Sequence, residues 1–337
     1  MKNKTFLVAG AGGFIGGHLV NRLIKLGANV IAADIKPIDI WFQKFDKAKN
    51  YQLDLKDLEN CRRLVVNTDY VFNLACNMGG MGFIENNKAE CMLSVLINTN
   101  LLIASKEYKV KKFFFSSSAC IYNTNLQENT YIEGLRESDA YPAMPEDGYG
   151  WEKLFSERMC NHFYEDFGLN ISVARFHNVY GPYGTYDGGR EKAPAAICRK
   201  LIESKNNNTN KIEVWGDGNQ TRSFLYIDDC IDGVINLFQT NYNKPLNIGS
   251  DEQVSINEMI EIIASFSDQK NVEKIYLLDK PKGVRGRSSN NEKCKKILGW
   301  SFKTSLKDGL YQTYNWIEEN MTKNNLDSSK FRLSKIC

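Results

Sequence analysis

Three side chains in this sequence have the types and spacing needed to remove a hydride and a proton from a carbon that carries a hydroxyl group. Ser118 is the last of three serines after a strand predicted over residues 111–116, so we expect it at the strand's carboxyl end, where α/β sheets bind ligands. Tyr149 and Lys153 are four residues apart and share one face of a predicted helix. A lysine ammonium beside a phenol lowers the phenol's pKa from about 10, which prepares it to take a hydroxyl proton. The set predicts alcohol oxidation by a nicotinamide cofactor.

Cys120 and Lys192 go beyond what simple oxidation requires. Alone, a buried cysteine is usually inert and a loop lysine is usually a surface charge. As a pair they can move protons on carbon, because a thiolate on one face of a keto sugar removes a proton and an ammonium on the other face delivers one. Such groups need pKa values tuned toward neutrality. The five residues together predict an enzyme that oxidises a sugar, inverts stereocentres beside the new ketone, and reduces it again.

A glycine turn at the start of the chain predicts the cofactor site. A strand over residues 4–9 runs into glycines spaced three apart, and a helical apolar pattern follows over residues 19–26. In this setting the turn brings backbone N–H groups, at a helix N-terminus, close to the pyrophosphate of a dinucleotide. The predicted contacts are Gly10, Gly13, Phe14, Ile15 and Gly16.

Two aspartates extend the predicted cofactor site. Asp34 ends a second strand, where its carboxylate would accept hydrogen bonds from a ribose diol and repel a 2′-phosphate. It therefore favours NAD over NADP, although Lys36 nearby weighs against that choice. Asp54 ends a third strand and either bonds the adenine amino group or caps the next helix, the commoner role for aspartate there.

The bulk properties exclude several classes of protein. A net charge of +3, from 43 basic and 40 acidic residues, gives no general reason to expect nucleic-acid or membrane partners. No apolar run approaches ~20 residues, and a strand predicted from residue 4 leaves no room for a signal peptide. Nine scattered cysteines without a CxxC predict reduced thiols in the cytoplasm. The three histidines are widely separated and form no metal-ligand spacing, so we expect no metal.

The order of predicted elements indicates an α/β fold. Strand-like and helix-like stretches alternate from residue 4 to about 175, as in βαβ units. We expect a doubly wound Rossmann-type parallel sheet with a smaller C-terminal substrate-capping domain. The NAD-binding domain is placed at residues 1–176, with 225–248 returning to it, the substrate-binding domain at 177–224 and 249–322, and a peripheral tail at 323–337.

Helices are predicted over residues 85–108, 150–167 and 193–204, and a basic loop over residues 282–287. The second helix has a wide apolar face that includes Trp151, Leu154 and Phe155. Such a face must pack on something, so we expect it to cover the sheet and also to support a homodimer interface.

Longer strings of residues make the prediction specific. The chain resembles the extended short-chain dehydrogenase/reductases and, among them, the GDP-mannose 3,5-epimerase family, from about residue 4 to 320. The most specific strings are Met78-Gly-Gly-Met-Gly-Phe83 and Gly188-Gly-Arg-Glu-Lys-Ala-Pro194, supported by Ser117-Ser-Ala-Cys-Ile-Tyr122, Arg175-Phe-His-Asn178, Gln220-Thr-Arg-Ser-Phe224 and Val284-Arg-Gly-Arg287.

The resemblance implies roles at the matching positions. Cys120 and Lys192 would be the proton-transfer pair, with Tyr149, Lys153 and Ser118 for the redox step. The GDP-sugar would contact Gly79, Ser118, Ala119, Cys120, Asn178, Glu191, Lys192, Lys200, Gln220, Arg222 and Arg285. Arginine and lysine suit the diphosphate because they form charge-assisted hydrogen bonds. The implied reaction converts GDP-mannose to GDP-L-galactose and GDP-L-gulose, with bound NAD and a small-molecule GDP-sugar as partner.

Alternatives stay open at this point. Asn123 replaces a common proline of the family and Tyr141 a usual tryptophan, which leaves room for a modified GDP-hexose or GDP-heptose as substrate. A nucleotide-hexose 4-epimerase would share Ser118, Tyr149 and Lys153 but has no use for Cys120 and Lys192. A 4,6-dehydratase typically has an Asp-Glu pair where this chain has Ala119-Cys120. A non-catalytic NAD sensor would tend to lose the tyrosine or the lysine, and both are present.

Overall fold

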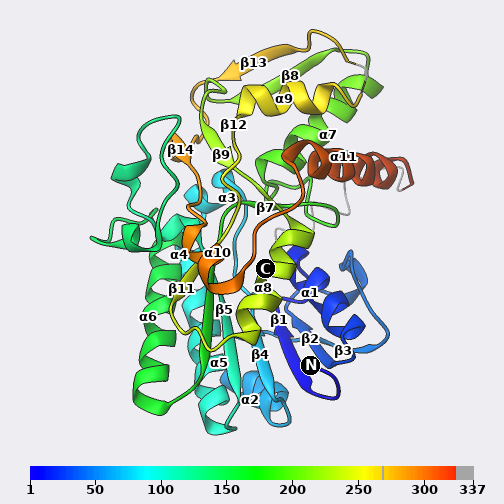
Figure 1. The fold of residues 1–337 in the computed structure, drawn as a ribbon. Coiled ribbons are helices and arrows are strands. Elements are labelled where there is room, and N and C mark those ends of the chain that lie inside the picture. The colour runs from blue at the N-terminus through cyan, green and yellow to red at the C-terminus, as the bar shows by residue number, and fades with distance from the viewer. Residues whose placement is uncertain (268, 324–337) are drawn as a thin grey trace.

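The computed structural model, which describes residues 1–267 and 269–323, is built around one parallel sheet of seven strands (Figure 1). The strand order is β11-β6-β5-β4-β1-β2-β3, and every neighbouring pair is parallel. This confirms the predicted doubly wound sheet. Its strands are β1 (Thr5–Ala9), β2 (Asn29–Asp34), β3 (Ala48–Gln52), β4 (Tyr70–Asn73), β5 (Lys112–Ser118), β6 (Ile171–Phe176) and β11 (Pro245–Ile248).

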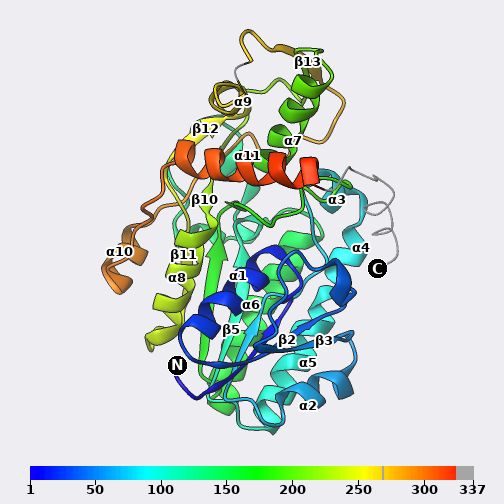
Figure 2. The ribbon, with the colours of Figure 1, turned by 90° about the vertical axis from the view of Figure 1, so that its right-hand side faces the viewer.

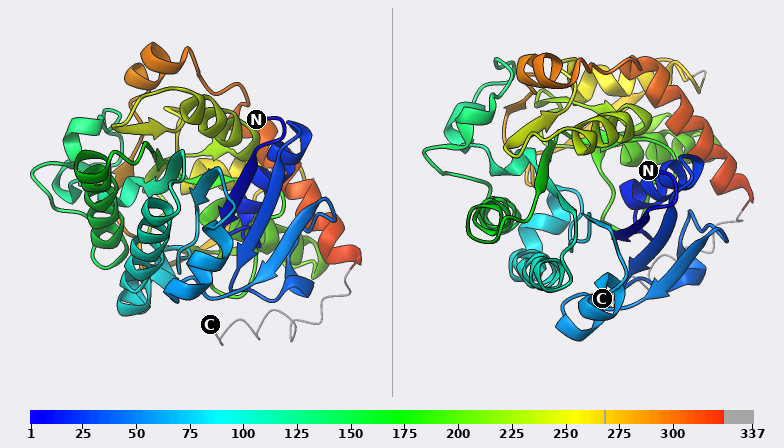
Figure 3. Two further views of the ribbon diagram at one scale, coloured as in Figure 1. Left: turned by 90° about the horizontal axis from the view of Figure 1, so that it is seen from below. Right: turned by 60° about the horizontal axis from the view of Figure 1, so that its bottom comes forward.

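Helices cover both faces of the sheet because its strands are apolar on both sides. Along β1, Phe6 and Val8 enter one core cluster, whereas Leu7 and Ala9 enter another. The first cluster lies under α1 (Phe14–Lys25) and α8 (Ile227–Gln239). The second lies under α2 (Leu58–Val65), α5 (Ser94–Glu107) and α6 (Tyr149–Phe167). Figure 3 shows α5 and α6 side by side on that face.

Two further helices and four short 3-10 helices complete this half of the molecule. They are α3 (Met81–Asn86), α4 (Lys88–Met92), η1 (Ile38–Ile40), η2 (Ala119–Ile121), η3 (Thr124–Gln127) and η4 (Glu137–Ala140). Of these, η2 directly continues the carboxyl end of β5 and so carries the candidate site.

The remaining elements form what we call the C-terminal lobe, most of which stands beyond the carboxyl edge of the sheet in the upper part of Figures 1 and 2, whereas α10 packs lower down, beside β11 and α8. Its strands pair as β10-β7, β12-β9-β14 and β13-β8. The elements are β7 (Val179–Tyr180), α7 (Ala193–Asn206), β8 (Lys211–Trp215), β9 (Thr221–Ser223), β10 (Leu225–Tyr226), β12 (Gln253–Ser255), α9 (Ile256–Ala264), β13 (Glu273–Leu277), β14 (Gly286–Arg287), α10 (Glu292–Leu298) and α11 (Leu306–Lys323). Between them, α8 and β11 return to the sheet.

The structure corrects several expectations. The helix predicted over residues 85–108 is three helices, because Asn87 adopts a non-helical backbone (φ −136°, ψ 43°) and a further break falls at Leu93. The predicted basic loop over residues 282–287 ends in a strand, β14, whose Arg287 is buried. Residues 324–337 of the predicted tail lie outside the described residues.

Candidate active site

Ser118 and Cys120 stand at the carboxyl end of the central strand β5. Ser118 is the last residue of β5 rather than a residue after it, and its Oγ accepts a hydrogen bond from the backbone N–H of Cys120 (3.2 Å). This bond caps η2 and fixes the direction in which Cys120 leaves the strand. The carbonyl of Cys120 in turn accepts a hydrogen bond from the N–H of Glu146 (3.0 Å). The serine and the cysteine are therefore held by backbone geometry on both sides.

Tyr149 and Lys153 occupy the first turns of α6, as predicted, and both are buried. The Nζ of Lys153 lies 5.6 Å from the centre of the Tyr149 ring and 3.6 Å from a carboxylate oxygen of Glu152. Lys153 Nζ has no hydrogen-bond partner among the described residues, which is unusual for a buried ammonium. An orphaned donor at this depth fits a group that accepts hydrogen bonds from the lysine, as a nucleotide ribose would.

The expected lowering of the Tyr149 pKa is wrong for the structure. Burial raises the pKa of Tyr149 well above its ordinary value, and the nearby Cys76 and Cys120 raise it further. A hydrogen bond with Ser118 works in the opposite direction but does not compensate. Desolvation of the phenolate is the largest cause of the rise, because the phenol is enclosed by protein.

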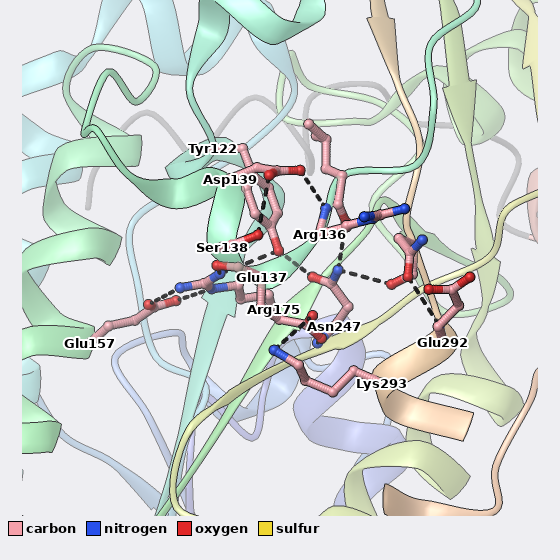
Figure 4. Close-up of polar contacts among 12 residues, drawn as sticks. Tyr122, Arg136, Glu137, Ser138, Asp139, Glu157, Arg175, Asn247, Glu292 and Lys293 are labelled. Carbon is pink, nitrogen blue, oxygen red and sulfur yellow. Dashed lines mark hydrogen bonds and ion pairs between the residues drawn. The ribbon is translucent and has the colours of Figure 1, made fainter. Parts of the chain in front are cut away.

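A buried polar network supports the turn that carries Ser118 and Cys120 (Figure 4). Arg175 of β6 donates to both carboxylate oxygens of Glu157 (2.9 and 2.8 Å), and Ser117 donates to the same carboxylate. On the other side of the turn, Tyr122 accepts from Arg175 (3.3 Å) and donates to Asn247 of β11. The residues just before and just after the candidate site are therefore tied to the same arginine, which fixes the turn between them.

Lys192 is the N-cap residue of α7 and is brought to the site by an adjoining loop. Gly80 donates its N–H to the carbonyl of Arg190 (3.0 Å), and a Cβ at Gly80 would overlap the carbonyl oxygen of Glu191. Arg190 stacks on the ring of Phe83 at 3.8 Å and donates to Asn77 (2.7 Å). The two specific sequence strings at residues 78–83 and 188–194 are thus packed against each other, and this contact positions Lys192.

The two proton-transfer candidates differ in how well they match the expected tuning. Burial lowers the pKa of Lys192, toward neutrality, as expected. Burial and the nearby Glu146 carboxylate instead raise the pKa of Cys120 to about 11, away from neutrality, although Arg287 opposes this. The charge of Cys120 acts on both Lys192 and Tyr149, which brings the three groups together in one site.

The glycine turn has the shape expected for a dinucleotide. A Cβ at Gly16 would overlap the carbonyl oxygen of Gly10, so only glycine lets α1 begin this close to the turn. Gly13 is the N-cap of α1 and provides no side-chain cap, which leaves the first helix amides, at Phe14 and Ile15, available to an anion. Together with Lys153, the turn fits a bound dinucleotide.

Asp34 bonds to the glycine turn, whereas Asp54 bonds within its own loop. Asp34 ends β2 next to the turn, and its carboxylate accepts from the N–H of Gly12 (3.0 Å) and of Lys36 (2.9 Å). Burial raises the pKa of Asp34, and the contacts with Lys36 and Gly12 oppose that rise. Asp54 accepts from the N–H of Lys56 within its own loop, and the cap of α2 is Asp57. Asp54 therefore does not cap the helix, and its contact with adenine stays a prediction.

The residues implied for the GDP-sugar are spread over the C-terminal lobe and the loops below it. Arg222 of β9 donates to backbone carbonyls, and burial with the neighbouring Arg287 lowers its pKa to about 10. Gln220 has a buried Oε1 without a partner among the described residues. Both observations fit a polar ligand in contact with these side chains.

The other implied residues have partners of their own. Asn178 (φ 43°) donates to Ser223, Lys200 to the carbonyl of Glu213, and Glu191 accepts from the N–H of Gly189. Arg285 is half-exposed and paired with Asp217 (2.9 Å). A Cβ at Gly79 would overlap Phe83, and Ala119 points into a separate apolar cluster with Tyr122, so these two residues offer only backbone atoms to a ligand.

Three residues near Cys120 were missed by sequence reasoning. Arg287 donates to the Cys120 sulfur (3.5 Å) and to Glu146 (2.8 Å), and Cys76 packs against the cluster that holds Cys120 and Tyr149. Arg287 is the last residue of the string 284–287 that resembles the family, but nothing in its spacing indicated a contact with Cys120, 167 residues away. Among residues 1–267 and 269–323, no group of three or more His, Cys, Asp or Glu side chains is placed to hold a metal. No helix in the same part of the chain has the length and apolar character to cross a membrane.

Comparisons with known proteins agree with this geometry. The model of the NAD dependent epimerase/dehydratase family matches residues 6–249. GDP-mannose 3,5-epimerase 1 of Oryza sativa subsp. indica is 48% identical over 317 residues, or 94% of this chain and 82% of that protein. The structure of UDP-glucose 4-epimerase from Thermotoga maritima with UDP-glucose has a TM-score of 0.83 at 26% identity, covering 94% of this chain and 99% of that one. UDP-glucuronic acid 4-epimerase from Bacillus cereus, solved with UDP-glucuronic acid and NAD, has a TM-score of 0.79 at 26% identity, covering 94% of this chain and 99% of that one.

Proposed function

The chain belongs to the NAD dependent epimerase/dehydratase family and, within it, to the GDP-mannose 3,5-epimerase family, and from this membership and its site we propose that it epimerises GDP-mannose. The products would be GDP-L-galactose, by inversion at C3 and C5, and GDP-L-gulose, by inversion at C5 alone. The observation that carries the proposal is a buried thiol, Cys120, and a partly buried ammonium, Lys192, within one site beside Tyr149. A nucleotide-hexose 4-epimerase would have no use for that pair.

Tyr149, Lys153 and Ser118 would carry out the oxidation and reduction at C4. Tyr149 would take the proton of the C4 hydroxyl, and Ser118 would position that hydroxyl from the end of β5. NAD supplies the hydride acceptor, and the positive charge of its oxidised ring favours the Tyr149 phenolate. Lys153, whose Nζ lacks a partner among the described residues, would hold the nicotinamide ribose. The hydride returns to the same sugar, so turnover needs no added cofactor.

Cys120 and Lys192 would carry out the proton transfers at C3 and C5. Once C4 is a ketone, the C–H bonds at C3 and C5 are acidified, and a proton can be removed from one face of the ring and replaced on the other. Lys192 suits the delivery step because burial lowers its pKa toward the working pH. Arg222 and Gln220 would hold the nucleotide diphosphate end of the substrate, in the C-terminal lobe.

The homodimer and the compartment are further parts of the proposal. Trp151 and Phe155 on the outer face of α6 are 43% and 53% exposed, and Leu96 on the neighbouring α5 is 42% exposed. Large apolar side chains gathered on two adjacent helices support an interface with a second copy of the chain. All eight described cysteines are free thiols, which supports the cytoplasm as the compartment.

Incubation with GDP-mannose in D2O tests the substrate and the chemistry together. Deuterium should enter at C3 and C5, as read by NMR, and C4 should keep its original hydrogen because the hydride does not exchange with solvent. Inversion at C4 without deuterium at C3 or C5 would indicate a 4-epimerase instead. No turnover of GDP-mannose, with turnover of a deoxy or heptose analogue, would assign a modified GDP-sugar as the substrate.

A further inference from the structure

The thiol of Cys120 lies beside a charged pair, Arg287 and Glu146, to which the reaction described above gives no role. Arg287 donates through one Nη atom to the Cys120 sulfur (3.5 Å) and through the other to Glu146 Oε1 (2.8 Å). Its Nε donates to Gln127 Oε1 (2.7 Å), so all three guanidinium nitrogens are engaged. Arg287 is 3% exposed and Glu146 is 8% exposed. A buried arginine with this many fixed bonds holds the sulfur and the carboxylate in constant relation to each other.

Glu146 has an unused acceptor next to the thiol. Its Oε2 is buried and has no hydrogen-bond partner among the described residues, while Oε1 is taken by Arg287. The backbone of Glu146 is bonded directly to the carbonyl of Cys120, and the two side chains interact: the carboxylate raises the pKa of the thiol, and the thiol and Arg287 lower the pKa of the carboxyl against the effect of burial. The resting state is therefore a neutral thiol beside an ionised carboxylate.

A neutral thiol cannot remove a proton from carbon, so a base must first receive the thiol proton. This inference rests on the proposed function. We propose that Glu146 takes the proton of Cys120 and that Arg287, bonded to both groups, stabilises the negative charge on whichever of them carries it. The S–H bond of Cys120 breaks and an O–H bond forms at Glu146 Oε2, which leaves a thiolate paired with Arg287. The thiolate then takes the proton from the carbon beside the ketone, and Lys192 delivers a proton to the opposite face.

The cycle closes through solvent. After one inversion Cys120 is a thiol again, Glu146 is a carboxylic acid and Lys192 is a neutral amine. Glu146 lines a cavity of about 720 Å³ together with Thr124, Asp147 and Lys282, and this cavity gives its proton a path out. Lys192 regains a proton from solvent, so protons and charges balance over the turnover.

Other charged groups face this pair from the surrounding elements. Arg222 of β9 interacts electrostatically with both Cys120 and Glu146. The charge of Cys120 also acts on Lys192 and Tyr149, and the charge of Glu146 acts on Glu85 of α3. Arg222, Arg287 and Lys192 are positively charged and favour a thiolate at Cys120. Among these neighbours of Cys120, Glu146 carries the negative charge that opposes the thiolate. Neutralising Glu146 by proton transfer therefore removes the main electrostatic obstacle to the thiolate.

The first experiment needs no substrate. The pH dependence of alkylation by iodoacetamide is measured at the Cys120 peptide by mass spectrometry in the NAD-bound protein. Glu146→Gln should move the midpoint to lower pH, because it removes the opposing anion, and Arg287→Met should move it to higher pH. Glu90→Gln is the matched control: Glu90 is an exposed carboxylate of α4 outside the cavity that Glu146 lines, and its midpoint should stay at the wild-type value. A midpoint that does not fall in Glu146→Gln, while Arg287→Met behaves as expected, would overturn the role of Glu146.

The second experiment uses deuterium exchange from D2O into GDP-mannose. At neutral pH Glu146→Gln should lose about 10²-fold or more of the exchange rate, as expected for loss of a proton acceptor, while transient reduction of bound NAD persists. Exchange should recover as the pH rises past the alkylation midpoint of the variant, because the thiolate then forms without Glu146. Loss without recovery would mean that Glu146 is only structural and would overturn the proposal, as would wild-type exchange at neutral pH. If the wild-type protein fails to exchange with GDP-mannose, the proposed function fails, and the alkylation experiment still decides the roles of Glu146 and Arg287.

Discussion

Arg175→Met should be strongly destabilising because it leaves a buried carboxylate without its partner. Arg175 makes four hydrogen bonds, two to Glu157, one to Tyr122 and one to the carbonyl of Glu137. Glu157 is 4% exposed, and after the substitution only the Ser117 hydroxyl remains to satisfy its charge. Breaking a buried ion pair from one side costs about 3–5 kcal/mol, so the free energy of unfolding should fall by about that amount.

The double variant Arg175→Met, Glu157→Met separates the stranded charge from the lost contacts. Removing both partners leaves the Ser117 hydroxyl without its acceptor and the Glu137 carbonyl without its donor, at about 1–3 kcal/mol each, but no buried charge. The double variant should therefore be no less stable than Arg175→Met alone. Urea unfolding followed by tryptophan fluorescence measures Arg175→Met, the single variant Glu157→Met and the double variant against wild type. A loss under about 1 kcal/mol in Arg175→Met, or costs that simply add in the double variant, would refute this account of the network.

Three further predictions concern the cofactor, the order of steps and the assembly. Denatured protein should release NAD, since Asp34 disfavours a 2′-phosphate, and mainly NADP in an enzymatic cycling assay would contradict this. Tyr149→Phe should lower turnover and deuterium uptake together by ~10²–10⁴-fold, whereas Cys120→Ala should keep the transient absorbance of reduced nicotinamide but give almost no epimerised product. Deuterium uptake at the wild-type rate in Tyr149→Phe would rule out oxidation as the first step, and near-wild-type turnover in Cys120→Ala would favour a 4-epimerase. The double substitution Trp151→Glu, Phe155→Glu should shift the mass measured by light scattering from dimer to monomer, and an unchanged dimer mass would place the interface elsewhere.

The elements closest to the N-terminus were predictable because their signals are local. The strand before Gly10, the turn and the helix after it follow from glycine spacing and apolar periodicity. The position of Tyr149 and Lys153 on one helix follows from their spacing. The breaks at Asn87 and Leu93 were missed, since neither residue is a strong helix breaker and the apolar pattern runs through them.

The surroundings of Cys120 could not be predicted for a different reason. Glu146 and Arg287 are 141 residues apart and meet only because β14 pairs with β9 above the site. Their effect on the thiol depends on burial, which a single sequence does not reveal for a charged residue. The same holds for Tyr149, whose pKa is raised by burial, whereas its spacing from Lys153 predicts a lower pKa.

The placement of β11 has a consequence for how the chain is made. This strand is the last of the seven to leave the ribosome, and the stretch from residue 177 to 248 takes on the order of 10 s to translate at about 5–20 residues per second. During that time β6 is an exposed edge, open to pairing with other nascent chains. Asn247, which accepts the Tyr122 hydroxyl, arrives with β11, so the turn that carries Cys120 receives its last support only then. The nucleotide-binding half therefore reaches its final form after much of the C-terminal lobe has been synthesised, and a fragment ending near residue 176 should aggregate rather than fold.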